Sequence, residues 1–204
     1  MNRKANLNIW LSFWVLAVVL AGPAAAVTHY VSPGQSIQAA IDAAANGDEI
    51  EVAPGTYNEP INFNGKGVRL YSSGGADVTT IDGTGHYHVV QCVSNEGADT
   101  VLEGFTITDG NANGAYPDYY GGGMYNNGSS PTVSNCTFVG NSAYTASVNQ
   151  AKGGGMYNYN SSPMVTNCTF SGNTAEGGGG MYNDHSSPTV TNCTFSGNTA
   201  EGGG

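Results

Sequence analysis

The sequence predicts an all-β solenoid, in which the chain winds as stacked coils of short strands. The segment Gly-Gly-Gly-Met-Tyr-Asn occurs three times, and its methionines are Met124, Met156 and Met181. Twelve residues after each methionine comes a cysteine within Asn-Cys-Thr-Phe. The step between methionines is first 32 and then 25 residues. A fixed motif with variable spacing is typical of stacked coils in which insertions are confined to one turn.

The spacing within each repeat indicates a corner at an asparagine. In Thr-Val-x-Asn-Cys-Thr-Phe, Val and Cys are three residues apart, so one continuous strand would place them on opposite faces. A left-handed corner at the Asn turns Val, Cys and Phe to the same inner face, and Asn tolerates this backbone well. An earlier copy over 102–107 has Gly104 at the corner, which fits because Gly also adopts positive φ.

Stacking of these coils predicts ladders of identical side chains about 4.8 Å apart, the spacing of adjacent strands. Stacked asparagines can hydrogen-bond along the axis. Disulfides within the cysteine ladder are one alternative, but three thiols leave one unpaired and parallel side chains have poor torsions, which favours buried free thiols. The predicted ladders are Met124, Met156 and Met181; Val133, Val165 and Val190; Asn135, Asn167 and Asn192; Cys136, Cys168 and Cys193; and Phe138, Phe170 and Phe195.

A short helix is predicted over 36–46, ahead of the repeats. Ser36 can cap it, four apolar residues between Ile37 and Ala44 form one stripe, and Gly47 can end it. Pro54-Gly55 is interpreted as a turn. Strand-like runs separated by turns are predicted at 49–52, 60–63, 68–71, 78–81, 88–93 and 101–108.

The first 26 residues are predicted to be a cleaved secretory signal. Arg3 and Lys4 precede an apolar run over 9–20, and Pro23 precedes three alanines before Val27. That run is short for a membrane span, which needs about 20 residues, so an uncleaved anchor is the lesser alternative. We expect one exported domain over 27–204, extracellular or on the cell surface (outer membrane). The chain ends inside a fourth Gly-rich motif, which predicts truncation within a repeat.

The stretch 36–57 and the repeats resemble the right-handed parallel β-helix of the pectate-lyase-like family. That resemblance implies a right-handed parallel β-helix whose short N-terminal helix covers the open end of the first coil. The segments 170–173 (Phe-Ser-Gly-Asn) and 178–181 (Gly-Gly-Gly-Met) resemble the repeats of polymorphic outer membrane proteins, with Gly in place of an Ala. This second resemblance covers only the last three repeats.

The predicted mature chain is strongly acidic. It keeps three basic residues, Lys66, Arg69 and Lys152, against 15 acidic ones. Such a surface repels nucleic acid and anionic lipid, so we expect no nucleic-acid partner and no membrane-spanning segment in the mature chain.

Catalysis would require groups that the sequence supplies poorly. A polysaccharide lyase of this fold needs clustered carboxylates to hold Ca²⁺ and one basic side chain as the base. The nearest acidic group, Asp99, Glu103, Asp109 and Asp118, lacks metal-binding spacing. A glycoside hydrolase needs paired aspartates on adjacent coils, where the repeats carry Asn, Ser and Thr. We assign no catalytic residue, metal ligand or cofactor, and expect Ca²⁺ only if the chain degrades a polysaccharide.

Tyrosines supply the candidate ligand-binding residues. Exposed aromatic rings can stack on sugars, whereas the structural alternative is that the tyrosines stack on one another. His86 and His88 share one strand face and are expected at the surface, not as metal ligands. The candidates are Tyr116, Asp118, Tyr119 and Tyr120 in a variable loop, and Tyr125, Tyr157 and Tyr182, which are expected to point outward beside the inward methionines.

Two functional hypotheses follow. The favoured one is a secreted or surface-exposed, non-catalytic repeat protein, a rigid stalk or adhesion module. A glycan or a host or cell-surface molecule is the expected kind of partner, and glycan binding distinguishes the second hypothesis. The regular polar repeat, the export signal and the scarcity of basic residues support it. The alternative is a carbohydrate-binding or polysaccharide-degrading β-helix, a lyase or glycoside hydrolase, that uses the loop over 116–120.

Overall fold

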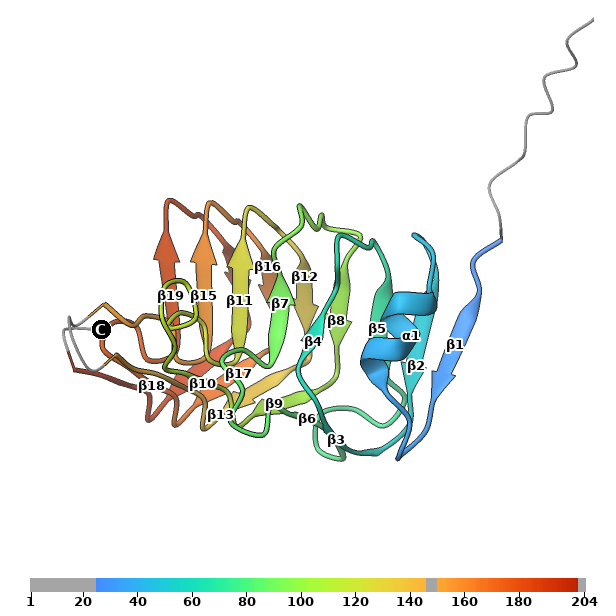
Figure 1. Ribbon diagram of the computed structural model, residues 1–204, viewed down its shortest axis with the longest axis horizontal. Coiled ribbons are helices and arrows are strands. Elements are labelled where there is room, and N and C mark those ends of the chain that lie inside the picture. Colours follow the sequence, from blue (N-terminus) through green and yellow to red (C-terminus); the bar gives the residue numbers. More distant parts are fainter. Residues whose placement is uncertain (1–24, 146–149, 202–204) are drawn as a thin grey trace, which may run out of the picture.

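The chain folds as a solenoid of parallel β-strands, shown by the computed structural model in Figure 1. The structure describes residues 25–145 and 150–201. Its strands form four sheets, here called A, B, C and D, of seven, six, five and four strands. The coils succeed one another along the long axis, with β1 and α1 toward one end and β18 and β19 toward the other (Figure 1).

Each sheet collects one strand from successive coils. Sheet A contains β1 (Thr28–Val31), β2 (Glu49–Val52), β5 (Arg69–Ser72), β8 (Val101–Glu103), β12 (Thr132–Ser134), β16 (Met164–Thr166) and β20 (Thr189–Thr191). Sheet B contains β3 (Gly55–Asn58), β6 (Thr79–Asp82), β9 (Thr106–Thr108), β13 (Thr137–Val139), β17 (Thr169–Ser171) and β21 (Thr194–Ser196). Sheet C contains β4 (Ile61–Asn62), β7 (Val90–Cys92), β11 (Met124–Asn127), β15 (Met156–Tyr159) and β19 (Met181–Asp184). Sheet D contains β10 (Asn111–Ala112), β14 (Ser142–Ala143), β18 (Thr174–Ala175) and β22 (Thr199–Ala200).

One full coil passes through sheets C, A, B and D in turn. Strands β11 to β14 form such a coil, which β15 to β18 and β19 to β22 repeat. Adjacent coils pair in register, so that Met124 lies beside Met156, which lies beside Met181. The rings of the phenylalanine ladder stack 4.7 Å apart and are tilted by only 3°. The predicted solenoid and its methionine, valine and phenylalanine ladders are confirmed.

A left-handed residue forms the corner between sheets A and B in each repeat. Asn135, Asn167 and Asn192 have φ angles of 55°, 54° and 53°, and Gly104 has a φ of 78°. This corner divides the predicted run over 101–108 into β8 and β9. The prediction of an asparagine or glycine corner is confirmed.

The interior is a continuous apolar column. One coil cannot bury its own inner face, so each neighbour supplies the cover. The four cysteines are free thiols, and burial raises the pKa of the Cys92 and Cys136 thiols well above the usual range, so these two are inert core groups. Fully buried members of the column include Leu70, Leu102, Val133 and Val165 of sheet A and Ile81, Ile107, Phe138 and Phe170 of sheet B.

An asparagine ladder, buried at Asn126 and Asn158, runs along sheet C at a position that the sequence analysis does not select. Asn126 Nδ2 donates to Asn158 Oδ1 at 2.8 Å, and Asn158 Nδ2 donates to Asn183 Oδ1 at 2.8 Å. Cys92 occupies the matching position in the preceding coil. The ladder therefore begins at Asn126, whose Oδ1 is buried without a hydrogen-bond partner in the described part of the chain.

A second ladder, buried at Asn141 and Asn173, joins these residues to Asn198 just before sheet D. Asn141 donates to Asn173 Oδ1 through both its backbone N–H and its Nδ2, at 3.0 and 3.1 Å. Asn173 donates to Asn198 Oδ1 in the same way, at 3.0 and 2.9 Å. The predicted ladder at the corners is weaker, because Asn135 and Asn167 are exposed and their amides lie 3.3 Å apart. Asparagine occurs at the corners because it tolerates a positive φ. It occurs at the buried positions because its amide forms hydrogen bonds between neighbouring coils.

The third glycine of each Gly-Gly-Gly motif lies where the backbones of adjacent coils approach closely. A Cβ on Gly123 would clash with the carbonyl oxygen of Gly155, and one on Gly155 would clash with that of Gly180. This packing leaves no room for a side chain, which explains the glycine at this repeat position.

Helix α1 (Ile37–Ala43) packs against β1, β2 and β4 at the N-terminal end of the solenoid (Figure 1). Ser36 caps it by accepting from the backbone N–H of Ala39 at 3.0 Å, as predicted. Ile37 and Ile41 are fully buried against the first coils. The helix thus covers the end of the apolar column, the role that the family resemblance implies.

The helix is shorter than predicted. Ala44 already has an extended backbone, so α1 ends at Ala43 and not at residue 46. Lys66 Nζ donates to the carbonyls of Ile41, Asp42 and Ala44 at 2.6–2.8 Å, which satisfies the end of the helix from a neighbouring coil. The sequence pattern does not reveal this tertiary cap.

Two strands of the first coil are not identified from the sequence. These are β1 and β3, and Gly55 begins β3 although Pro54-Gly55 is predicted to be a turn. In the described ranges, no helix is long and apolar enough to cross a membrane. The predicted signal over 1–26 lies almost entirely outside the described residues and stays a prediction.

Candidate functional site

The candidate site is a column of aromatic rings on the outer face of sheet C. Strands β11, β15 and β19 place Tyr125, Tyr157 and Tyr182 at one register position, next to the inward methionines. Neighbouring ring centroids are 5.9 Å apart and the rings are tilted by 15°. His88 extends the column, with its ring 4.9 Å from that of Tyr125. Strand alternation therefore produces an aromatic column outside the apolar core.

The loop over 113–120, between β10 and β11, meets this column. Its own backbone closes it, since the N–H of Asp118 donates to Ala115 O at 2.6 Å and that of Tyr120 donates to Pro117 O at 3.1 Å. Tyr119 packs against a small second apolar core, which anchors the loop. The members of this core are Ala112, Ala143, Ala151 and Ala175.

Three tyrosines of the loop contact one another and the column. Tyr120 stacks on Tyr157, with centroids 4.4 Å apart and a tilt of 7°. Tyr119 and Tyr116 meet Tyr120 edge-on, at 4.4 and 6.2 Å. The tyrosines predicted from the loop and from the repeats thus form one group, here called the tyrosine cluster: Tyr116, Tyr119, Tyr120, Tyr125, Tyr157 and Tyr182.

The cluster is more buried than the sequence suggests. Tyr125 and Tyr157 point away from the main core, but they are only 6% and 3% exposed because the loop and neighbouring rings cover them. The expectation of open outward rings is wrong for these two. Tyr116 is 73% exposed and lies at the edge of the cluster. Burial raises the pKa of Tyr120, Tyr125 and Tyr157, so these phenols stay protonated at neutral pH.

A cavity of about 90 Å³ opens among these rings, and we call it the tyrosine pocket. Tyr157 Oη donates to Asp184 Oδ2 at 3.2 Å, which places a carboxylate in the wall. Asn127 Nδ2 donates to Tyr125 Oη at 3.3 Å. The pocket is lined by Tyr116, Tyr120, Tyr125, Tyr157, Tyr159 and Asp184.

Sequence reasoning misses two residues of this pocket, Tyr159 and Asp184. They pair in register at the last position of β15 and β19, where β11 carries Asn127. The signal in the sequence is that the residue directly after the fixed Met-Tyr-Asn motif differs from one repeat to the next. Asp184 Oδ1 lies 2.7 Å from Nδ1 of the exposed His185.

Asp118 lies next to the buried His88. Asp118 Oδ1 is 3.6 Å from His88 Nε2, and His88 Nδ1 is 3.1 Å from the carbonyl oxygen of Gly121. His88 is only 3% exposed, so the predicted surface position is wrong for it, although His86 is exposed. Burial lowers the pKa of His88, which keeps the ring neutral and part of the stack.

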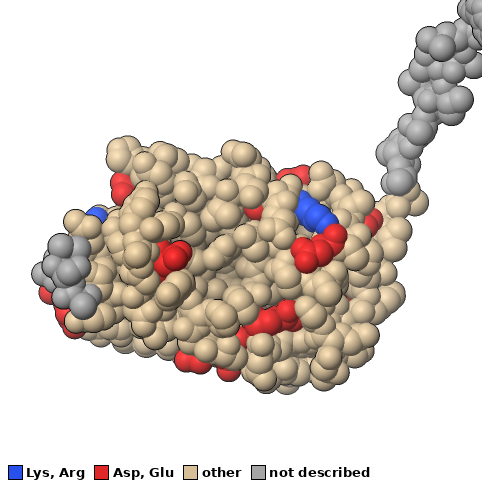
Figure 2. Space-filling model, in the orientation of Figure 1, with Lys and Arg blue, Asp and Glu red and all other residues tan. Residues whose placement is uncertain are grey.

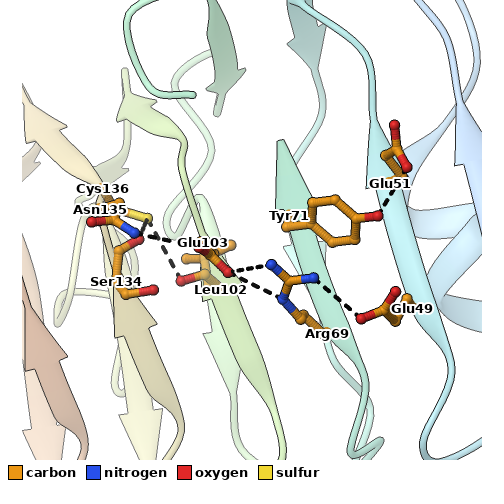
Figure 3. Close-up of polar contacts among 9 residues, drawn as sticks. All are labelled: Glu49, Glu51, Arg69, Tyr71, Leu102, Glu103, Ser134, Asn135 and Cys136. Atoms are coloured by element: carbon orange, nitrogen blue, oxygen red, sulfur yellow. Dashed lines mark hydrogen bonds and ion pairs between the residues drawn. The ribbon is translucent and has the colours of Figure 1, made fainter. Parts of the chain in front are cut away.

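The three basic side chains of the described chain make structural contacts. Lys66 holds the end of α1. Arg69 points between Glu103 and Glu49 on sheet A, at 2.8 and 3.2 Å (Figure 3). Lys152 Nζ donates to Tyr182 Oη at 3.0 Å and lies 4.5 Å from the centroid of that ring.

The acidic residues considered for a lyase serve different local contacts. Glu103 pairs with Arg69 in Figure 3, and Asp118 lies beside His88, whereas Asp99 and Asp109 are exposed. Within the described residues, no group of three His, Cys, Asp or Glu is placed to hold a metal ion. On the face shown in Figure 2, acidic side chains are scattered and most of the surface is uncharged.

Two larger hollows lack the features of the tyrosine pocket. One of about 460 Å³ lies over glycines and core residues of the last described coil, between Gly178 and Ala200. The other, of about 350 Å³, lies beside Ser36 and Glu59 at the start of α1. Neither gathers several aromatic rings around a carboxylate, so the tyrosine pocket is the stronger candidate.

Comparison with known protein families finds a match that covers all the repeats. The sequence model of the family described as the right handed beta helix region matches residues 51–204. The chain therefore belongs to the right-handed β-helix family. No curated protein matches the sequence.

Two solved structures are similar in fold. One is a pectin methylesterase in complex with hexasaccharide VII, with a TM-score of 0.50 and 13% identity over 86% of this chain and 67% of that one. The other is the pectin methylesterase from Aspergillus niger in a penultimately deglycosylated form, with a TM-score of 0.46 and 15% identity over 88% and 69%. The predicted right-handed parallel β-helix of the pectate-lyase-like class is confirmed.

Proposed function

We propose that the chain is a non-catalytic binding module, exported and displayed at the cell surface as a rigid stalk or adhesion element. The tyrosine cluster is the single observation that carries this proposal. The in-register coils hold its column at fixed spacing, and the loop over 113–120 adds three tyrosines at one place. In solenoids, insertions into individual repeats commonly form the binding face.

The contacts of the basic residues support a non-catalytic role. A general base must reach the proton that it removes. The Lys66 ammonium donates hydrogen bonds to three backbone carbonyls, and the Arg69 guanidinium forms ion pairs with two carboxylates. The Lys152 ammonium donates a hydrogen bond to the Tyr182 hydroxyl. Each side chain has a structural explanation that needs no substrate.

A carbohydrate-binding module is the second candidate, and the exposed aromatic side chains favour it. Tyr116 is 73% exposed, Tyr144 is 53% exposed and Tyr87 is 44% exposed. Rings that keep one face in water can stack on a sugar. This candidate differs from the first only in the chemistry of the partner.

A substrate screen and a glycan array test both candidates. The chain over 27–204 is incubated with pectin and polygalacturonate, with and without Ca²⁺, and products are measured. We expect no product, and depolymerisation or de-esterification that is lost in Lys152→Ala or Arg69→Ala would show an enzyme instead.

The array and intact cells are then probed with the chain, with Tyr116→Ala and with Tyr30→Ala. Tyr30 is 71% exposed in β1, at the opposite end of the molecule from β19, so it is a matched control (Figure 1). We expect binding that Tyr116→Ala weakens and Tyr30→Ala preserves. Hits confined to glycans would select the second candidate. Equal loss in both variants, or no binding to cells or glycans, would contradict a role for the cluster.

A further inference from the structure

The tyrosine pocket has the composition of a site for a positively charged group. Five phenol rings and one carboxylate line it, and none of its lining residues is basic. Aromatic faces carry partial negative charge and attract a cation that lies within about 6 Å of a ring centroid. Asp184 adds a full negative charge to the same wall.

The rings that line the pocket are set at different angles to one another. Tyr120 and Tyr157 stack on each other with centroids 4.4 Å apart, so the faces between them are closed to a ligand, whereas Tyr116 meets Tyr120 at 88°. Tyr125 continues the direction of Tyr157 with a tilt of 15°. The perpendicular Tyr116 and Tyr120 rings therefore give the pocket walls of two orientations, unlike the single flat platform on which a sugar ring stacks.

The charges around the tyrosine pocket also favour a positively charged occupant. Burial and then the charge of Asp184 raise the pKa of Tyr157, so the phenol is kept as a neutral donor to the carboxylate. The exposed His185 also contacts the Asp184 carboxylate, with Nδ1 2.7 Å from Oδ1. The same aromatic column already holds one cation in this structure, because the Lys152 ammonium lies over the Tyr182 ring.

The size of the cavity limits its occupant. At about 90 Å³, it is well below the roughly 300–1,000 Å³ of pockets that enclose drug-sized ligands. It suits a head group and not a whole oligosaccharide.

We propose that the tyrosine pocket binds a small organic cation, with a quaternary ammonium head group as the best-fitting class. This inference rests on the proposed role of the tyrosine cluster as the surface that contacts the partner.

A charged and a neutral probe of the same shape test the proposal. Choline and its uncharged isostere 3,3-dimethylbutan-1-ol are titrated into the chain over 27–204 by calorimetry, with methyl glucoside as a third probe. We expect choline to bind about tenfold or more tighter than the isostere, because only the cation gains the ring and carboxylate attraction.

Matched substitutions locate the site. Tyr116→Leu removes an exposed ring and should weaken choline binding about threefold to tenfold, whereas Tyr116→Phe keeps the ring and should change it less than about twofold. Asp184→Asn keeps the shape and should weaken choline about fivefold without affecting the isostere. Tyr30→Leu is the control, and thermal unfolding of each variant verifies that it is folded.

Several results would overturn the inference. They are equal binding of choline and the isostere, binding of methyl glucoside alone, absence of choline binding, or equal effects of Tyr116→Leu and Tyr30→Leu. If cell or glycan binding still depends on Tyr116 in those cases, the proposed function survives and only the ligand class is wrong.

Discussion

The side chain of Asn173 is fully buried and bonded to both neighbouring coils. Its Oδ1 accepts twice from Asn141, and its Nδ2 donates to Phe138 O and to Asn198 Oδ1. The corner residue Asn167 has the same chemistry but is exposed, with a φ of 54°. At the first site hydrogen bonding selects asparagine, and at the second site the backbone conformation selects it.

This difference predicts unequal costs of replacing the two residues. Asn173→Leu should lower the free energy of unfolding by about 3 kcal/mol, because buried donors and acceptors of both neighbouring coils lose their partner. Asn167→Gly should cost less than about 1 kcal/mol, because glycine adopts the same positive φ. Urea unfolding followed by circular dichroism measures both. Equal losses would show that the buried ladder adds nothing beyond the corner.

At the scale of elements, Asp48 joins the start of β1, the end of α1 and the start of β2. Its carboxylate accepts from the backbone N–H groups of Val27 and Ala45, each at 2.9 Å, and lies 3.1 Å from His29 Nε2. These hydrogen bonds, first those of Val27 and Ala45 and then that of His29, lower the pKa of Asp48 to about 2.

The lowered pKa predicts a specific loss of stability in acid. Because the folded pKa lies below the unfolded value of about 3.9, the contribution of Asp48 is complete above that value and disappears as the pH falls toward 2. Asp48→Asn should therefore lower the melting temperature at pH 6 and flatten its decline between pH 4 and about 2. Asp77→Asn, which replaces an exposed carboxylate, is the control. An unchanged decline in Asp48→Asn would refute the linkage.

At the scale of elements, the sequence predicts the repeated strands of sheets A, B and C, but it does not predict those of sheet D, although they also repeat. The Asn-Cys-Thr-Phe copies reveal their own register, because one alignment fixes the corner and the inward residues together. The end of α1 depends on Lys66 from another coil, and no local pattern encodes that contact. The burial of Tyr157 likewise depends on Tyr120 in a loop that has no second copy. Asp184 departs from the repeat, so the repeat pattern does not reveal it, although it lines the pocket together with the repeated Tyr125 and Tyr157.

At the scale of the whole molecule, stability is a sum over neighbouring coils. Each coil contacts only the coils before and after it, so an inner side chain with two neighbours is buried more deeply than one with a single neighbour. Phe170 is fully buried between Phe138 and Phe195, with ring centroids 4.7 Å away on both sides. Phe195 has one ring neighbour among the described residues and is 47% exposed.

The two phenylalanines therefore form a matched pair at equivalent repeat positions. Phe170→Ala should lower the free energy of unfolding by about 4 kcal/mol, because it removes a buried ring and leaves a cavity between two coils. Phe195→Ala should cost less than half as much, because about half of that ring is already in water. Urea unfolding of both variants provides the test, and hydrogen exchange shows where each one opens. We expect Phe195→Ala to release only the last described coil, whereas Phe170→Ala weakens the coils on either side of it. Equal losses for the two variants would show that burial of the ring between two neighbouring coils does not set its contribution to the stability of this solenoid.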